Sequence, residues 1–405
     1  MHKEKIKGPI IKMHILHIPS WYPTKNYPLS GIFIKEQIEA ISLFSHDTKN
    51  TVILWGHEES QFRVRSPMTY FSNRSTLEPY GKITKKFVNE VNMIISPATW
   101  WSNRLPFGGA SVLLKSARKC LIAADDPIDI IHAHVSYPAG YIAYELSKEF
   151  NIPFIITEHM GIGRIPDYMK NGKPINQIRD AYRESSASIS VSTFLKDHLM
   201  EIGLPITHIV PNLVNEDKFL PVLKNNNKFI FLLMSNLSFQ KGIDTFLEAA
   251  ARVKKSNLEC EFWIAGSGPD ESKLKAMSKS LGLENSVFWL GHISRKNAPD
   301  IFQQSDVFVL PSRFETFGVV YAEALGCGKP VIATRCGGPL DIVNSKNGLL
   351  IDINDIEQLG DAMKKMYKKY SFFNQNSIRM SFLDKFSRSA VVSKIIKIYK
   401  EVLEM

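Results

Sequence analysis

Glu315 and Glu323 are eight residues apart and flank a short stretch that contains Gly318. The residues before them, 306–310, have the pattern of a buried strand, and those after Gly318 have the pattern of a helix. A loop that turns into a helix at the carboxyl end of a strand is where open α/β sheets bind ligands. We therefore expect the free N–H groups of residues 317–320, together with the helix dipole, to hold a diphosphate.

Each position in this segment suits a different part of such a ligand. Gly318 has no Cβ and lets a phosphate approach the backbone closely, while Val319 and Val320 supply N–H groups at the helix start. Glu323, one turn into the helix, could accept hydrogen bonds from both hydroxyls of a ribose. Glu315, in the loop before the helix, would point toward the group that the diphosphate carries. Two glutamates at this spacing are common on solvated surfaces, so the surrounding loop-to-helix pattern carries the interpretation.

Polar residues also follow strands that the pattern predicts in the first half of the chain. His159 follows the apolar run 153–157 and is a candidate active-site residue, with Glu158 beside it as an acceptor-site group, a cap, or a residue without a role. His134 lies within an apolar run, so a buried structural role competes with a functional one. Gly31 opens a helical segment, and it marks either an anion-binding helix start or a simple tight turn.

Short apolar runs alternate with segments of helical period along the whole chain, which is typical of βα units that build a parallel sheet. Several runs are apolar throughout, as strands buried on both faces must be. The predicted strands of the first half are 14–18, 51–55, 129–135, 153–157 and 186–192. A second array of similar size begins at residue 228, so the fold class is α/β with two Rossmann-like domains.

A polar, proline-containing stretch at 205–228 separates the two arrays and suits a domain linker. A chain of 405 residues exceeds what one hydrophobic core usually holds, which also favours two domains with a cleft between them. We expect an N-terminal domain over 1–210, which binds the acceptor, and a nucleotide-binding domain over 211–385. Residues 386–405 form a separate C-terminal helix that could return to the first domain.

The composition is that of a soluble globular protein, with 44% hydrophobic and 22% charged residues. Lys and Arg number 24 against 19 Asp and Glu up to residue 210, and 26 against 21 beyond it, so each half carries a net charge of +5. An evenly spread excess suits anionic small substrates or an acidic membrane surface. It lacks the dense basic stripe of a nucleic-acid reader, so no nucleic-acid partner is expected.

The cysteines and the apolar segments bear on the compartment of the protein. Its four cysteines show neither a C-x-x-C pair nor a Cys/His cluster with metal-ligand spacing, and they are expected to be reduced, cytoplasmic thiols. The apolar stretch that follows the basic first 12 residues is short and broken by His and Pro, unlike a signal peptide or an anchor. No run reaches the roughly 20 apolar residues that span a bilayer.

Two segments leave membrane contact open as an alternative. The helix expected over 386–403 has one apolar face, which favours docking on a core over a basic amphipathic helix on a membrane. The segment 92–115 is rich in aromatic and apolar residues, with Arg104 and Lys115 nearby. Core and loop packing is the favoured explanation, and a membrane-facing patch is the alternative.

The residues RFETFGVVYAEALGCGKPVIAT, over 313–334, resemble the E-x7-E segment of the family 4 retaining glycosyltransferases. The segments SNLSFQKGID (235–244), WIAGSGPD (263–270) and CGGPLDIV (336–343) are similar to further motifs of that family, in the same order. Segments in the first half, including SWYPTKNYPLSGIFIKEQ and IITEHMG, match more loosely. The resemblance covers nearly the whole chain and implies the GT-B fold.

The resemblance implies a role for single residues of this chain. Lys241 matches a lysine that contacts the diphosphate of the donor, and Gly266 and Gly268 match a Gly-rich turn of the donor site. Glu315 and His159 match the active-site glutamate and histidine. Where the family has an arginine as a second phosphate clamp, this chain has Asn236.

An asparagine brings no positive charge, so stabilisation of the leaving group would depend more on Lys241 and the helix N–H groups. Arg295 and Arg313 are the candidates for a replacement cation.

The implied reaction is transfer of a hexose or N-acetylhexosamine, with retention, from a nucleoside-diphosphate sugar to a glycan, without an obligatory metal or other cofactor. We expect a UDP-sugar or GDP-mannose as donor and a glycan or lipid-linked glycan as acceptor, in bacterial surface polysaccharide synthesis at the cytoplasmic face of the inner membrane. Two alternatives stay open. One is a sugar-nucleotide epimerase on the same scaffold, and the other is a non-enzymatic protein that binds ligands in a cleft.

Overall fold

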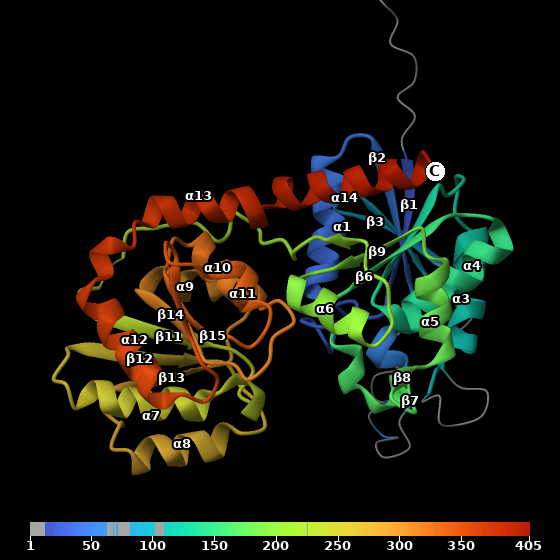
Figure 1. Cartoon of the computed structure of the whole chain (residues 1–405). Helices are drawn as coiled ribbons and strands as arrows, with labels where there is room; N and C mark the ends of the chain where they lie inside the picture. Colours follow the sequence, from blue (N-terminus) through green and yellow to red (C-terminus); the bar gives the residue numbers. More distant parts are fainter. Residues whose placement is uncertain (1–12, 63–67, 69, 72–81, 102–108, 225) are drawn as a thin grey trace, which may run out of the picture. The chain divides into compact units, whose positions relative to one another are not determined.

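The computed structural model describes residues 13–62, 68, 70, 71, 82–101, 109–224 and 226–405 (Figure 1). The chain divides into two compact units. Unit 1 comprises Met1–Val191, Lys196–Val210 and Val391–Met405, and unit 2 comprises Ser192–Leu195 and Pro211–Ala390.

Unit 1 is built on an eight-stranded sheet with the order β10-β9-β6-β5-β1-β2-β4-β3. Its strands are parallel except β3, which pairs antiparallel with β4 at one edge. The strands are β1 (Met13–Pro19), β2 (Thr48–Leu54), β3 (Thr84–Val88), β4 (Val91–Ile95), β5 (Ile130–His134), β6 (Phe154–Glu158), β9 (Ala187–Ser190) and β10 (His208–Ile209). A separate two-stranded hairpin joins β7 (Met169–Lys170) and β8 (Lys173–Pro174).

The α-helices described in the first half of the chain follow strands, as the alternating pattern predicts. They are α1 (Ile32–Phe44), α3 (Ala110–Ile122), α4 (Tyr141–Phe150), α5 (Asn176–Glu184) and α6 (Thr193–Glu201). Single helical turns lie at η1 (His57–Ser60), η3 (Ile162–Arg164) and η4 (Pro166–Tyr168), and the segment η2 (Ser136–Gly140) is an irregular turn in which Tyr137 is extended. Strands β5 and β6 are buried along their whole length because strands pair with both of their edges and helices cover the faces of the sheet.

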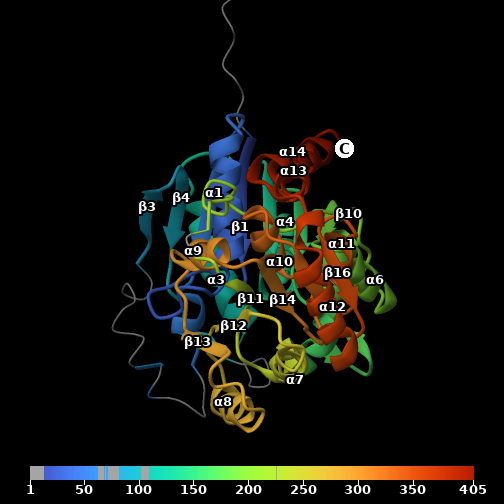
Figure 2. The ribbon, with the colours of Figure 1, turned by 90° about the vertical axis from the view of Figure 1, so that its left-hand side faces the viewer.

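Unit 2 contains a six-stranded parallel sheet with the order β13-β12-β11-β14-β15-β16. The strands are β11 (Phe229–Met234), β12 (Cys260–Ala265), β13 (Val287–Gly291), β14 (Val307–Leu310), β15 (Val331–Thr334) and β16 (Gly348–Ile351). The helices are η5 (Phe239–Lys241), α7 (Ile243–Lys254), α8 (Glu271–Ser280), α9 (Ala298–Gln304), α10 (Val319–Gly326), α11 (Pro339–Ile342), α12 (Ile356–Lys368), η6 (Tyr370–Phe372) and α13 (Gln375–Phe386). Figure 2 shows helix α7 beside this sheet.

The last helix, α14 (Arg388–Leu403), packs its apolar face on unit 1. Val391, Val392 and Ile395 are buried, and the hydroxyl of buried Tyr399 bonds to His132 of β5. The apolar face of α14 is therefore docked on the core of unit 1, as the sequence analysis favoured. Among the described residues, no helix is both long enough and apolar enough to cross a membrane.

Two parts of the segment 92–115 belong to a strand and a helix that the sequence did not predict. Residues 92–95 belong to strand β4, where Ile94 is buried, and residues from Ala110 belong to helix α3. These parts are core packing, the favoured explanation. Residues 102–108, with Arg104, lie outside the described part of the chain.

Candidate active site

The predicted loop-to-helix segment of unit 2 is formed as expected. Strand β14 ends at Leu310, and helix α10 begins at Val319 after Gly318, whose φ of 88° is in the left-handed region. A Cβ on Gly318 would lie 2.6 Å from the ring of Tyr321, whose hydroxyl donates to the carbonyl of Leu310. The backbone can therefore turn into the helix here only with glycine or with movement of a buried ring.

Glu315 lies at the centre of a cluster of polar side chains from two loops of unit 2. Its Oε1 accepts from Lys241 Nζ at 2.6 Å and from Ser312 Oγ at 2.8 Å. Glu315 is only 8% exposed, so its carboxylate is held by these partners away from bulk water. Two of the predicted site residues, Lys241 and Glu315, are thus brought together, and Ser312 is a member of the cluster that the sequence did not reveal.

Arg313 fastens the loop of Glu315 to the loop of Lys241. Its guanidinium forms a two-pronged ion pair with Asp244, at 2.9 and 2.8 Å, and lies 3.9 Å from the centre of the Phe239 ring. Its backbone N–H donates to the carbonyl of Gln240 at 2.8 Å. These contacts hold the loop of Lys241 in place. Because the guanidinium of Arg313 is already paired with Asp244, it is a poor candidate for the replacement phosphate clamp.

Arg295, the other candidate cation, is paired with Glu323. Its Nη1 donates to Glu323 Oε1, and its guanidinium lies 5.1 Å from the centre of the Phe219 ring. Glu323 is 5% exposed, so the pair is largely shielded from water. The charge of Arg295 is thus balanced by the glutamate that we expect to bind a ribose, as that of Arg313 is balanced by Asp244.

The Gly-rich turn packs against the segment that contains Asn236. A Cβ on Gly266 would lie 1.8 Å from the carbonyl oxygen of Ser235, and one on Gly268 would lie 2.3 Å from that of Leu237 and 2.5 Å from Asn236 Oδ1. Both glycines are needed because two backbone segments meet at these positions. The structure therefore places the side chain of Asn236 at this turn, where the resemblance implies a donor site.

The predicted residues of unit 1 converge at the carboxyl end of its sheet. His134 is the last residue of β5, and His159 follows the end of the neighbouring strand β6. Their rings are stacked with centroids 6.2 Å apart, and the ring of Phe33 from helix α1 lies 4.7 Å from His159. Gly31 precedes that helix, and a Cβ there would lie 2.3 Å from the carbonyl oxygen of Trp21.

Glu158 is fully buried and bound to the backbone of two loops. Its carboxylate accepts from the N–H groups of Ser136 at 2.9 Å, His159 at 2.9 Å and Met160 at 3.1 Å, and from the hydroxyl of Tyr182 at 3.4 Å. Burial raises the pKa of this carboxyl, and the three N–H bonds oppose that shift. Of the alternatives for Glu158, these contacts favour a cap that fixes the loop of His159.

Three histidines that are far apart in the sequence lie together in the sheet of unit 1. Ring nitrogens of His17, His132 and His134 are within 4.8 Å of one another, a grouping of possible metal ligands that spacing along the chain did not indicate. The rings of His132 and His134 stack with centroids 4.1 Å apart and an angle of 27°. Nitrogens on stacked rings do not converge on one point, as ligands of a metal ion must. We therefore interpret the cluster as a set of hydrogen-bonded histidines and not as a metal site.

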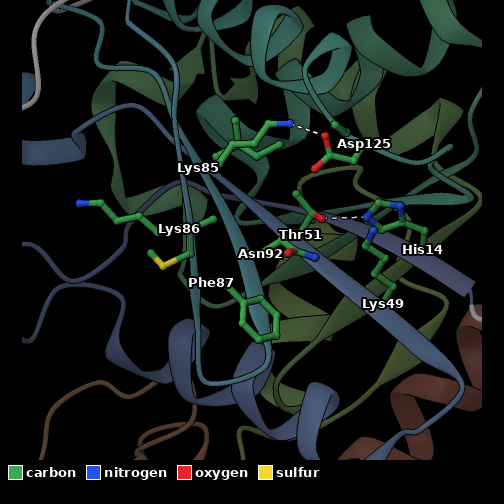
Figure 3. A pocket seen from close by; sticks show the side chains of 11 residues that line it. His14, Lys49, Thr51, Lys85, Lys86, Phe87, Asn92 and Asp125 are labelled. Atoms are coloured by element: carbon green, nitrogen blue, oxygen red, sulfur yellow. Dashed lines mark hydrogen bonds and ion pairs between the residues drawn. The ribbon is translucent and has the colours of Figure 1, made fainter.

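A separate recess of about 220 Å³ lies near the amino-terminal ends of β1 and β2 (Figure 3). Asp125 at its rim pairs with Lys85, and the adjacent Asp126 pairs with Lys49. Asp125 and Asp126 are 75% and 56% exposed. Both are solvated surface carboxylates, as expected for a turn before Pro127.

Two family models match the chain. The model "Glycosyl transferases group 1" matches residues 214–378, and the model "Glycosyltransferase Family 4" matches residues 70–218. Together they cover residues 70–378, which include His134, Glu158 and His159 of unit 1 and the site residues of unit 2, while strands β1 and β2 precede the matched part.

Known proteins of similar sequence include a glycosyltransferase and a sugar-phosphate synthase. A glycosyltransferase of Methanocaldococcus jannaschii is 28% identical over 310 residues, which are 73% of this chain and 82% of the relative. The mannosylfructose-phosphate synthase of Agrobacterium fabrum is 27% identical over 323 residues, 68% of this chain and 71% of the relative.

Solved structures with low sequence identity share the fold. Sucrose-phosphate synthase from Thermosynechococcus elongatus has a TM-score of 0.72 at 16% identity, over 97% of this chain and 100% of the other. HepE of Anabaena in complex with UDP and glucose has a TM-score of 0.67 at 18% identity, over 96% and 99%.

The matched models and named relatives describe transferases, which supports neither the epimerase nor the non-enzymatic binding protein. The chain is an enzyme of the sugar-transferring class EC 2.4 that uses a nucleotide sugar, and it has the α/β GT-B fold with two parallel-sheet domains. On these grounds the chain belongs to family 4 of the glycosyltransferases.

Proposed function

We propose that the protein transfers a hexose or N-acetylhexosamine from a nucleoside-diphosphate sugar to a hydroxyl of a glycan, with retention of configuration at the anomeric carbon. The observation that carries this proposal is the cluster of Lys241, Glu315 and Ser312 beside the helix start at Gly318. It puts a cation, a shielded carboxylate and free helix N–H groups in one unit, the set of groups that a sugar diphosphate requires.

In this reaction the bond between the anomeric carbon and the phosphate oxygen breaks, and the acceptor oxygen bonds to the same carbon. The acceptor hydroxyl gives up its proton to the departing phosphate. Negative charge grows on the departing diphosphate, where Lys241 and the N–H groups of residues 317–320 stabilise it. Positive charge grows on the sugar ring, near Glu315. Arg295 and Glu323 face the nucleoside, and Asn236 with Gly266 and Gly268 lines the donor site.

His159 and His134 belong to the acceptor side of the proposed reaction, with Gly31 at the helix start beside them and Glu158 holding the loop of His159. Their place at the carboxyl end of the sheet of unit 1 supports this role. The HepE structure contains UDP and glucose, which makes UDP-sugars the first donors to test, with GDP-mannose beside them.

We further propose that the acceptor is a glycan or lipid-linked glycan of a bacterial surface polysaccharide, reached at the cytoplasmic face of the inner membrane by peripheral contact. The four cysteines are free thiols, which supports a reducing compartment. Flotation with anionic vesicles tests the membrane contact. Protein that stays unbound at low salt would contradict it.

The donor is found by thermal unfolding of the full chain with UDP-glucose, UDP-galactose, UDP-N-acetylglucosamine and GDP-mannose. A ligand at about 100 times its Kd stabilises the folded state by about 2.7 kcal/mol, so the true donor stands out in the melting temperature. NMR of the product then gives the anomeric configuration, and an inverted product would contradict retention. We expect turnover to persist in EDTA.

A Glu315→Gln variant separates binding from chemistry. It keeps an oxygen for Lys241 but lacks the carboxylate charge, so turnover should fall by about 100-fold or more while donor binding stays measurable. Full turnover of this variant would show that Glu315 has no part in the chemistry.

A further inference from the structure

Strands β1 and β5 carry four buried histidines, and three of them use both ring nitrogens in hydrogen bonds. His14 bonds to the carbonyl of Pro127 at 2.9 Å and to Thr51 Oγ1 at 2.8 Å. His132 bonds to the hydroxyls of Tyr399 and Thr157, each at 2.7 Å.

His17 bonds to Asn50 Oδ1 through Nε2 at 3.0 Å and to His134 Nε2 through Nδ1 at 3.2 Å. His134 differs from the other three. Its Nδ1 is buried, and the described residues provide no hydrogen-bond partner for it.

The direction of the hydrogen bonds that lead to His134 is fixed at their far end by a backbone carbonyl. The carbonyl oxygen of Ser45 can only accept, so the hydroxyl of Thr48, 3.1 Å away, donates its proton there. Thr48 Oγ1 must then accept from Asn50, whose Nδ2 lies 3.1 Å from it. The amide nitrogen of Asn50 therefore faces Thr48, and its Oδ1 faces His17.

From Asn50 the same logic sets the tautomer of both histidines. An amide oxygen can only accept, so His17 carries its proton on Nε2 and has a lone pair on Nδ1. That lone pair accepts from His134, which must carry its proton on Nε2. A neutral imidazole has one proton, and the lone pair of His134 is therefore on Nδ1, the atom without a partner.

Both rings are neutral at ordinary pH, as this chain requires. Burial lowers the pKa of His17 to about 4 and lowers that of His134 well below its usual value. Neither imidazole then gains a second proton that would reverse the direction of the chain.

A buried acceptor without a donor destabilises the fold, so its position needs a reason. His134 is the last residue of β5, and its ring stacks on that of His159 at the carboxyl end of the sheet. We propose that His134 Nδ1 accepts a hydrogen bond from a sugar hydroxyl of the substrate, with the acceptor tautomer fixed by the chain Ser45–Thr48–Asn50–His17. This inference rests on the proposed glycosyl transfer, and it names the atom and the direction of one substrate contact.

The tautomer is tested on the full chain with ¹⁵N-labelled histidine, by NMR correlation of ring nitrogens with ring protons. We expect His134 Nδ1 to resonate as an unprotonated, pyridine-like nitrogen. His14 is an internal reference of the opposite tautomer, because its Nδ1 must donate to the carbonyl of Pro127. The spectrum of His134→Asn assigns the signals, and a protonated Nδ1 on His134 would overturn the proposal.

Metal analysis of the purified protein belongs to the same experiment. Ligation by His17 Nδ1 and His134 Nε2 would require lone pairs on both atoms, whereas the chain places a proton between them. One equivalent of bound zinc that is lost in His134→Asn would therefore contradict the assigned tautomer and with it the proposal.

Ligand contact is tested by adding UDP-glucose, GDP-mannose or methyl α-D-mannopyranoside to the labelled protein. A hydroxyl that donates to Nδ1 moves this nitrogen resonance upfield, while that of His14 stays in place. Should the resonance stay in place with every one of the three probes, the substrate contact is refuted and a buried water is the remaining partner. This readout does not depend on turnover, so it stands even where glycosyl transfer fails.

Two variants of His134 separate substrate contact from structural support. Asparagine places its Oδ1 near the position of Nδ1, whereas glutamine reaches the position of Nε2 and keeps the bond to His17. We expect kcat/KM with the donor found by thermal unfolding to fall by about 10-fold or more in His134→Gln, the loss of one buried hydrogen bond, and only a few-fold in His134→Asn. A glutamine variant as active as the asparagine variant would overturn the proposal.

The same variants identify which sugar provides the hydroxyl. If His134→Gln slows both donor hydrolysis and transfer to a glycan, the contact is with the transferred sugar. If it slows only transfer, the contact is with the acceptor. A wild-type protein that turns over none of the four donors would contradict the proposed choice of donor, and the NMR measurement would still decide the tautomer and the hydroxyl contact.

Discussion

Lys241 and Glu315 form an ion pair of 2.6 Å in unit 2 although 74 residues separate them in the sequence. A Cβ on Gly242 would lie 2.0 Å from the carbonyl oxygen of Pro311, so the backbones of the two loops are in direct contact. This contact brings the ammonium group and the carboxylate together before any ligand is bound. The cation for the diphosphate is thus held in place by the carboxylate expected near the sugar.

Replacing Lys241 with alanine should lower kcat by about 100- to 1000-fold, because Asn236 offers no second charge to stabilise the leaving diphosphate. Lys241→Arg keeps the charge and should recover part of this loss. Lys273→Ala, at an exposed position of helix α8, is the matched control and should be fully active. Steady-state kinetics with the identified donor measure the effect. Undiminished turnover by Lys241→Ala would place the diphosphate elsewhere.

Arg313→Lys should destabilise unit 2 by about 1–3 kcal/mol, because lysine cannot reproduce the two-pronged bond to Asp244. Arg335→Lys is a suitable control, since Arg335 forms a single ion pair with Asp352 in which both side chains are about half exposed or more. That change should cost less than about 1 kcal/mol. Urea unfolding of the three proteins gives the comparison, and equal effects would argue against a fastening role for Arg313.

Glu158→Gln should lower the free energy of unfolding by about 1–3 kcal/mol, because an amide cannot accept from all three N–H groups that the carboxylate binds. The loop of His159 should loosen as a result, and kcat should fall. The control is Glu149→Gln, at an exposed ion pair with Arg118. A glutamine variant with wild-type stability and kcat would show that the loop does not need this carboxylate.

Acid should destabilise unit 1 through its buried histidines. The pKa of His17 is lowered to about 4 and that of His57 to about 3, each by burial, while both titrate near 6.5 in the unfolded chain. Below pH 6.5 the unfolded state therefore binds more protons, and the free energy of unfolding falls as the pH falls. Each such histidine should cost about 2 kcal/mol at pH 5 relative to pH 7.5.

Urea unfolding at several pH values measures this dependence. A His17→Asn variant should show a shallower fall between pH 6.5 and pH 5 than the wild type. The prediction fails if the two proteins share the same slope, since His17 would then titrate alike in both states.

Ala in place of Gly318 should weaken donor binding more than Ala in place of Gly282. Both glycines have positive φ, at 88° and 67°, so both substitutions strain the backbone. Only the Cβ at 318 would meet the ring of Tyr321, whereas the space around Gly282 is open. Thermal shifts with the identified donor compare the two, and equal shifts would show that the turn at Gly318 tolerates a side chain.

The sequence by itself determined the class of fold and the family. Apolar runs such as 307–310 and 154–156 are short and uninterrupted, and only strands covered on both faces bury such runs completely. The turn at Gly318 and the order of motifs around it are local features, readable from neighbouring residues. The fold class and the family are confirmed by the matched family models and by the two large sheets, in which the strands other than β3 are parallel.

The tertiary structure decided which distant side chains meet. The sequence of residues 235–244 does not show that Lys241 pairs with Glu315, or that Asp244 forms an ion pair with Arg313. These contacts depend on how neighbouring strands are paired in the sheet. In the same way, His17 of β1 lies 115 residues or more from His132 and His134 of β5 along the chain. Only the parallel register of the two strands brings the three rings together. A hydrogen bond requires a distance near 3 Å and a defined direction, and these are set by the packed backbone rather than by residue type.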